Sequence, residues 1–421
     1  MSRRSERLPR PQKPVQRVTL SEEHTTLRLW LTVGLILVAA AAFTYGVVNL
    51  LGRQSGWTEI GVSTDYADTC AGELTFQYEL GAGGLAAGAE YRQVEQVYTQ
   101  AAIDAYQIFH GSETFDGVGN LASLSASPNR EVEVDPALYA ALTLLEEQGG
   151  RYLYLAPVYQ AYRNLFACTD DDQAADFDPL RSEEAAAWIR DLTAFTADPE
   201  AVDLELLGNG RARLRVSEAY LSFARENGVT AFLDLGWMEN AFRVDYVADV
   251  LTESGYTAGS LSSYDGFARC LDRREQSYRL DLYDRTEGSV CRAGQMAYTG
   301  PMSLVSLRDF PLGRLDVLHY YQCPDGRIVT AYADPADGLS RTAASQLTAY
   351  SRDRSCAQVL LDVAGFYVAD SLDETALLAL PAAGTELVLC REGTVLHTQP
   401  DLSVTELFES GEIRYTARVW K

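Results

Sequence analysis

The stretch over residues 234–251 decides the fold, and it reads DLGWMENAFRVDYVADVL. A short strand is expected over residues 231–235, followed by a turn for which Gly236 is suited. Residues 242–254 carry apolar side chains at helical spacing and end at Gly255, which predicts an amphipathic helix. Its inward-facing residues are Val247, Val250 and Leu251. The stretch therefore predicts a strand, a turn and a helix in direct succession.

Hairpin signals lie on both sides of this stretch. Alternating residues 202–206 and 211–216 flank Asn209-Gly210, and residues 386–390 and 394–397 flank a second turn. Asn-Gly between alternating segments is a strong hairpin signal. Helices mixed with antiparallel hairpins, without regular βαβ alternation, predict an α+β fold.

The N-terminal part carries an uncharged run, residues 29–51, that is 23 residues long. About 20 apolar residues suffice for a helix to cross a bilayer. Seven basic residues precede the run and only Arg53 follows it closely, which retains the N-terminus in the cytoplasm. A cleaved signal peptide would have a shorter apolar core and a small-residue cleavage site.

We therefore expect four parts along the chain: a basic cytoplasmic tail over residues 1–28, a transmembrane helix over 29–51, a linker over 52–69, and an extracytoplasmic domain over 70–421. Beyond residue 53 the chain holds 27 basic and 56 acidic residues, a net charge of −29. Such a surface repels phosphate backbones, which argues against a nucleic-acid partner.

Seven cysteines lie in the outer part, with neither a CxxC pair nor the spacing of a zinc site. An oxidising compartment permits disulfides, but the odd count leaves at least one thiol over. Cys270 and Cys291 bracket a predicted hairpin and are the first candidates for a pair. Buried free thiols are the alternative.

Four segments, in order, resemble the ApbE-like FAD:protein FMN transferases. Residues 234–251 resemble that family's D-L-G-G-I-A-K-G-Y-A-V-D-x-V-A-x-x-L segment, residues 332–338 its H-I-I-D-P-x-T-G loop, and residues 357–363 its A-D-A-L-A-T-A helix. The hairpin around Gly393 is similar to the family's last hairpin. The resemblance spans roughly residues 70–420 and implies the family's T-fold-related α+β domain in a protein of the bacterial cell membrane.

The resemblance implies a chemistry. Members cleave FAD with Mg²⁺ and attach FMN through a phosphoester to a threonine or serine of a target protein, here an exported or membrane redox protein. It implies flavin contacts from five residues and a metal site from three. The flavin residues are Gly236, Trp237, Asn240, Asp334 and Gly338, and the metal residues are Glu239, Gln358 and Asp362.

The chain departs from the family where the chemistry lies. The family's lysine is Asn240 here, and the chain's only lysines are Lys13 and Lys421. The loop histidine is also missing from residues 330–335. No catalytic residue can therefore be named from the pattern.

Of the metal side chains, aspartate has become Gln358 and threonine has become Asp362. Positions four apart share one helix face, and Mg²⁺ accepts amide, carboxylate and carbonyl oxygens. A weakened metal site at Gln358, Asp362 and the Glu239 carbonyl is thus one hypothesis. The alternative is that Asp362 is a solvated helix residue. Asp245 is expected to cap or pair locally.

Three functions remain open. The first is a degenerate relative that binds a flavin or a protein partner, and the second is an active transferase with a rebuilt magnesium site. The third is an envelope domain with an unrelated role. The four histidines are widely spaced, without a His-Glu-x-x-His pair, and no Gly-x-Ser-x-Gly elbow exists, so the sequence does not predict a zinc or serine hydrolase.

Overall fold

The computed structural model describes residues 25–51, 55–82, 85–286, 289–410 and 413–421. The chain divides into two units, Met1–Gln54 and Ser55–Lys421. The first unit contains helix α1, Thr25–Leu51. Among the described residues, no helix combines the length and the apolar character that crossing a membrane requires, so the helix predicted to span over residues 29–51 is not supported.

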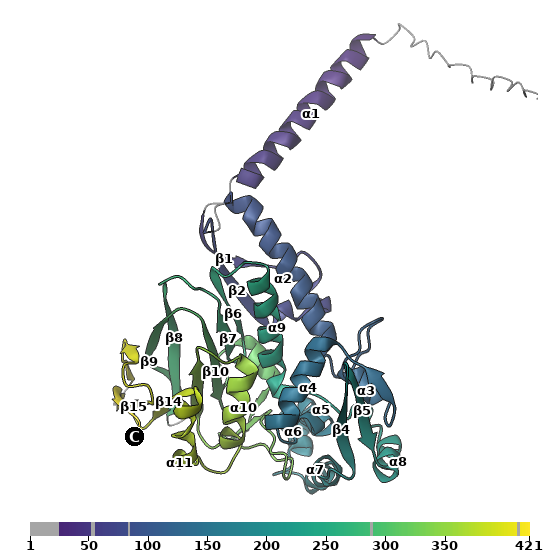
Figure 1. The fold of residues 1–421 in the computed structure, drawn as a ribbon, viewed down its shortest axis with the longest axis vertical. Helices are drawn as coiled ribbons and strands as arrows, with labels where there is room; N and C mark the ends of the chain where they lie inside the picture. Colours follow the sequence, from purple (N-terminus) through teal and green to yellow (C-terminus); the bar gives the residue numbers. More distant parts are fainter. Residues whose placement is uncertain (1–24, 52–54, 83–84, 287–288, 411–412) are drawn as a thin grey trace, which may run out of the picture. The chain divides into compact units, whose positions relative to one another are not determined.

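The second unit is built on a nine-stranded sheet (Figure 1), in which every neighbouring pair is antiparallel except the last, β15 with β19. In spatial order the strands are β1 Gly56–Ile60, β2 Leu74–Leu80, β6 Gly259–Ser263, β7 Phe267–Cys270, β10 Met302–Arg308, β13 Gln346–Ser351, β14 Glu386–Arg391, β15 Thr394–His397 and β19 Thr416–Val419.

Strand β1 corrects one predicted boundary. It pairs with β2 from Gly56 opposite Leu80 to Ile60 opposite Phe76. The range 52–69, predicted as a linker, therefore contains an edge strand of the main sheet. The folded unit begins before residue 70.

Both faces of the sheet are covered. Helices α2 Ala87–Phe109, α9 Glu239–Glu253 and α10 Cys356–Tyr367 pack against one face (Figure 1). The strands β8 Ser277–Thr286, β9 Ser289–Thr299 and β16 Ser403–Thr405 form a smaller sheet that shares a separate core with the main sheet. On β10, Val305 and Leu307 belong to the helix-side core, whereas Met302 and Leu304 belong to the other. This is the alternation that a strand imposes on its side chains.

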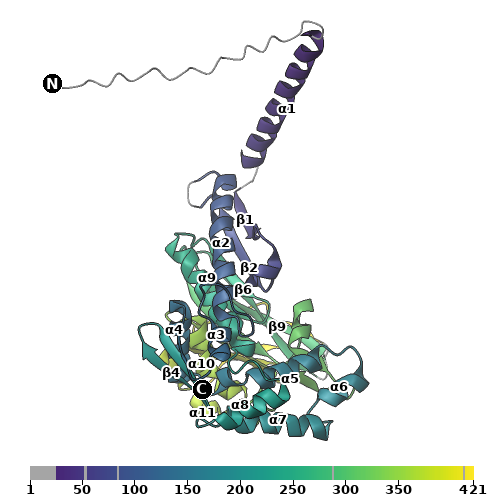
Figure 2. The same ribbon diagram turned by 90° about the vertical axis from the view of Figure 1, so that its right-hand side faces the viewer.

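A helical region lies between α2 and α9 in the sequence (Figure 2). It contains α3 Leu121–Ala126, α4 Pro136–Gln148, α5 Ala156–Phe166, α6 Asp171–Phe177, α7 Glu183–Thr196 and α8 Glu218–Asn227, with a small sheet of β3 Glu131–Glu133, β5 Arg211–Val216 and β4 Val202–Gly208. The predicted hairpin is confirmed, since β4 and β5 pair around Asn209 and Gly210, both at positive φ.

Short elements complete the chain: β11 Tyr320–Gln322, β12 Ile328–Thr330, α11 Glu374–Leu377, β17 Glu409–Ser410 and β18 Ile413–Arg414. The α+β class and the hairpin of β14 with β15 are confirmed. The strand predicted over residues 231–235 is wrong. There the backbone N–H groups of Phe232 and Leu233 donate to the Ser125 hydroxyl, at 3.2 and 3.3 Å, instead of to a neighbouring strand.

All seven cysteines are free in this structure, so the predicted Cys270–Cys291 pair is wrong. Cys270 is buried on β7, and the Cys291 sulfur lies 3.1 Å from the Tyr415 hydroxyl. Both side chains belong to the core between the two sheets, where they fill space as small apolar groups.

Candidate functional site

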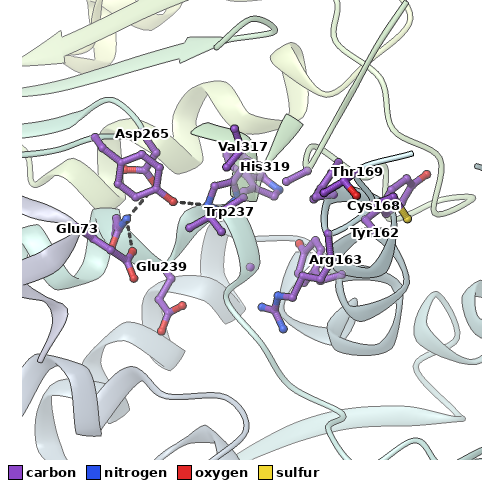
Figure 3. A pocket seen from close by; sticks show the side chains of 18 residues that line it. Glu73, Tyr162, Arg163, Cys168, Thr169, Trp237, Glu239, Asp265, Val317 and His319 are labelled. Atoms are coloured by element: carbon purple, nitrogen blue, oxygen red, sulfur yellow. Dashed lines mark hydrogen bonds between the residues drawn. The ribbon is translucent and has the colours of Figure 1, made fainter. Parts of the chain in front are cut away.

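A cavity of about 790 Å³ lies where α5, the start of α9 and the turn between β6 and β7 meet (Figure 3). This is within the range of small-molecule sites. Most of its wall is aromatic or apolar, from Tyr159, Tyr162, Phe166, Ala167, Trp237, Tyr264, Val317, Leu318 and Ala331. The polar lining residues are Glu73, Arg163, Cys168, Thr169, Glu239, Asn240, Asp265 and His319.

The turn before α9 sets one side of this cavity. The Asp234 carboxylate accepts hydrogen bonds from the Gly236 N–H and from Arg163, both at 2.7 Å. Gly236 has a φ of +56°, and a Cβ there would overlap the Tyr159 ring. Only glycine meets both conditions. The turn places Trp237 in the wall, edge-on to the Tyr332 ring with 5.0 Å between centroids.

Three carboxylates form what we call the acidic wall: Glu73, Glu239 and Asp265. Figure 3 shows them together on one side of the cavity. The Asn240 amide nitrogen donates to Glu73 at 2.9 Å and to Asp265 at 3.0 Å. Arg243 lies 2.7 Å from Glu239 and 3.4 Å from Glu73, and only 5% of its side chain is exposed. The three carboxylates therefore share one guanidinium and one amide, and Asp265 accepts a further hydrogen bond from the Ser263 hydroxyl at 2.5 Å.

Burial changes the protonation of this site. It raises the pKa of Asp265 to about 6, and the charge of Glu73 acts in the same direction. It also raises the pKa of Glu239, against the opposing effect of Arg243. Burial lowers the pKa of His319 to about 4, so this imidazole is neutral near pH 7 and hydrogen-bonds to the Tyr264 hydroxyl.

Arginine charges at the cavity already have acidic partners. Arg163, on the side opposite the acidic wall in Figure 3, is ion-paired to Asp234. Arg243 is ion-paired to Glu73 and Glu239 of the acidic wall. No lysine lines the cavity among the described residues, which agrees with a chain whose only lysines are Lys13 and Lys421.

The structure brings together four of the eight predicted site residues: Gly236, Trp237, Glu239 and Asn240 all line the cavity. Asp334 and Gly338 do not. The Asp334 carboxylate accepts from the Ala336 N–H at 2.8 Å and lies 3.4 Å from Arg341. Gly338 lies one layer behind the wall, because its carbonyl accepts from the Tyr162 hydroxyl at 3.1 Å.

Gln358 and Asp362 are also outside the cavity lining, and their oxygens are engaged elsewhere. The Gln358 side chain accepts from the Ser355 N–H at 3.0 Å and so closes the capping box of α10. Asp362 pairs with Arg354 at 3.0 Å and accepts from the Thr385 hydroxyl at 2.6 Å.

These contacts do not fit the predicted magnesium site. Within the part of the chain that the structure describes, no group of three or more His, Cys, Asp or Glu side chains is placed to hold a metal ion. Asp362 is not the solvated residue of the alternative either, since only 12% of its side chain is exposed.

Sequence reasoning missed Glu73, Tyr264, Asp265 and His319. They come from segments far apart in the chain, and no local pattern marks Glu73. The position of Ala331 is the one signal in the sequence that could have pointed to His319. It stands where the family's loop has histidine, and its N–H donates to the His319 carbonyl at 3.0 Å. A histidine from the adjacent segment therefore stands beside that position.

No protein-family model and no curated protein sequence matches the chain. Solved structures do match. The ApbE protein from Thermotoga maritima superposes with a TM-score of 0.54 at 12% identity, over 84% of this chain and 97% of that one. The flavin transferase ApbE from Vibrio cholerae gives 0.53 at 10% identity, over 84% and 98%. A histidine-to-glycine mutant of it gives 0.51 at 11% identity, again over 84% and 98%. The chain therefore has the fold of the ApbE flavin transferases, as the resemblance predicts.

Proposed function

We propose that this chain is a divergent relative of the FAD:protein FMN transferases that binds a flavin without transferring FMN. The observation that carries the proposal is the cavity at the start of α9. Gly236, Trp237, Glu239 and Asn240, four of the residues that the resemblance assigns to the flavin and the metal, line this one cavity together with the rings of Tyr159, Tyr162, Phe166 and Tyr264. A planar ring system buries its faces well against such side chains.

The absence of transfer is proposed from the site's charged groups. Phosphoryl transfer needs positive charge on the phosphates, which a metal ion and positioned cations supply. Here the family's lysine is an asparagine that donates to two carboxylates. Gln358 and Asp362 are held by Ser355, Arg354 and Thr385. Their oxygens are engaged in these contacts, which argues against a magnesium-assisted step.

The test uses the full chain, purified in mild detergent, and an active ApbE transferase as a positive control. Incubation with riboflavin, FMN or FAD should quench flavin fluorescence, and Trp237→Ala should weaken binding at least about tenfold, since it removes a buried aromatic wall. With FAD and Mg²⁺, we expect no AMP release above the protein-free rate. Absence of any flavin binding would overturn the proposal.

AMP release that depends on Mg²⁺ would instead favour the active enzyme. Its acceptor would then be a threonine or serine of an exported or membrane redox protein. A double variant, Asp362→Ala with Gln358→Ala, distinguishes this case, because it removes the two predicted metal side chains. Loss of AMP release in that variant would restore the magnesium hypothesis.

We also propose that residues 29–51 anchor the chain in the bacterial cell membrane, with a cytoplasmic N-terminus. Support comes from the sequence alone: 23 uncharged residues with basic residues before them. The chain should stay with membranes after alkaline carbonate extraction, and protease added to spheroplasts should digest the large domain. Recovery of the full-length chain in the supernatant would overturn the anchor and leave the flavin proposal unaffected.

A further inference from the structure

We infer that the cavity selects an aromatic ligand that carries no phosphate and offers N–H or O–H donors, so that it takes riboflavin in preference to FMN or FAD. This inference rests on the proposed flavin function and narrows its ligand. The charges that face the cavity support it.

The acidic wall has more negative charges than positive charges beside them. Its three carboxylates are served by one guanidinium, that of Arg243, which lies within 3.4 Å of Glu73 and 2.7 Å of Glu239. When all three are ionised, two negative charges remain uncompensated at this wall. The Asn240 amide contributes hydrogen bonds to two of them, but no charge.

The opposite side supplies no balancing cation. Arg163 lies 2.7 Å from Asp234, whose side chain is only 8% exposed, so the pair is close to neutral as a unit. His319 carries no charge near neutral pH, because burial lowers its pKa. Among the described residues that line the cavity, Arg163 is the one arginine and there is no lysine.

A phosphate would therefore enter a cavity with a net negative charge. A phosphate monoester carries about two negative charges above pH 7. Two unit charges about 8 Å apart at an effective dielectric of about 20 repel enough to change a dissociation constant more than tenfold. The aromatic rings of the ligand meet no such penalty.

The same wall favours donors on the ligand. The carboxylates of Glu73 and Asp265 both accept from the Asn240 amide nitrogen, and each has one further side-chain donor, Arg243 for Glu73 and the Ser263 hydroxyl for Asp265. Each carboxylate oxygen can accept more than one hydrogen bond, so acceptor capacity remains. Charge-assisted hydrogen bonds to carboxylates are about twice as strong as neutral ones. A ring N–H or a ribityl hydroxyl fits this need, whereas a phosphate brings only further acceptors.

The experiment compares riboflavin, FMN and FAD on the full chain at pH 8, where Asp265 is ionised. Riboflavin should bind at least about tenfold more tightly than FMN. The difference should narrow between 0.05 and 0.5 M NaCl, because salt screens the repulsion. Glu73→Gln should strengthen FMN binding about threefold to tenfold and change riboflavin binding little. Glu147→Gln, an exposed carboxylate on α4, is the matched control and should leave the ratio unchanged.

The outcomes separate the two proposals. FMN or FAD binding as tightly as riboflavin, without added metal, would overturn the charge selection and leave the flavin function standing. No binding of any flavin would overturn both. Should Glu73→Gln fail to fold, the salt dependence of the unmodified chain still decides, since a selection based on charge must weaken with salt.

Discussion

Two carboxylate sites on the first half of α9 differ in how well their charges are matched. At Asp245, one carboxylate accepts from the backbone N–H groups of Cys356 and Ala357, at 2.9 and 2.8 Å, and pairs with Arg269 at 2.6 Å. It caps the N-terminus of α10 and ties that helix to α9. Two backbone N–H groups and one guanidinium therefore hold this single carboxylate.

One and a half turns earlier, the acidic wall has the opposite balance. Glu73, Glu239 and Asp265 share one positive charge, that of Arg243, with Asn240 and Ser263 as neutral donors, and they face a cavity instead of a helix end. Carboxylates whose charge is balanced hold a fold together, whereas carboxylates whose negative charge exceeds the positive charge beside them cost stability and are typical of ligand sites. The first site is structural and the second is the candidate for binding.

The largest expected effect is on stability, when the carboxylate of the structural site, Asp245, is removed. Asp245→Ala leaves two buried N–H groups without their acceptor and leaves Arg269 only its 3.4 Å contact with Asp249, so the free energy of unfolding should fall by about 3–5 kcal/mol. Denaturant unfolding followed by circular dichroism measures it. Asp249→Ala is the control, because that side chain is 62% exposed and pairs with the same arginine at 3.4 Å. A loss below about 1 kcal/mol at Asp245 would contradict its structural role.

A smaller effect is expected at the turn that places Trp237 in the cavity wall. Gly236→Ala forces a side chain into the left-handed region and into the Tyr159 ring, which should cost about 2–3 kcal/mol and weaken flavin binding. Gly326→Ala is a matched control, since it has a φ of +87° but open space around its Cβ. Its cost should stay near 1 kcal/mol. Equal losses in both variants would mean that contact with Tyr159 is unimportant.

The excess negative charge of the acidic wall predicts that removing one of its carboxylates stabilises the protein, and that this stabilisation depends on pH. Because burial raises the pKa of Asp265 to about 6, ionising it above that pH costs stability. Asp265→Asn should therefore stabilise the chain by about 1 kcal/mol at pH 8, and this gain should shrink as the pH falls from 6 towards 4. Thermal unfolding at several pH values tests the sign. Destabilisation at pH 8 would show that the carboxylate is adequately paired.

The smallest expected signal is the titration of His319, measured by NMR of labelled histidine. Its pKa should lie near 4, since burial disfavours the imidazolium. This depressed pKa makes stability fall as the pH drops from about 6.5 to 4, the reverse of the Asp265 effect. A midpoint at or above 6.5 would place a cation in the cavity near neutral pH and would weaken the charge argument.

Local patterns predicted what depends on neighbours in the sequence. The apolar spacing after residue 242 predicted α9, which in fact begins at Glu239, and Asn209-Gly210 predicted the hairpin of β4 with β5. For Asp245 the sequence indicated a cap or a pair, and the structure shows both.

Tertiary contacts decided the rest. Spacing placed Gln358 and Asp362 on one helix face, but it could not reveal Arg354 and Thr385 as the partners of Asp362. Glu73 and Asp265 meet at Asn240 although 192 positions separate them in the chain. No pattern within a window of the sequence could join them.

Because its cysteines are unpaired, alkylation of their thiols can report local unfolding of this chain without an added label. Burial raises the pKa of Cys270 to about 11 and that of Cys70 to about 12, so neither forms a reactive thiolate while its surroundings stay closed. Five thiols are buried: Cys70, Cys270, Cys323, Cys356 and Cys390. They extend from the edge strands to the far hairpin, so the order in which they become alkylated under mild denaturant would trace which part of the domain comes apart first.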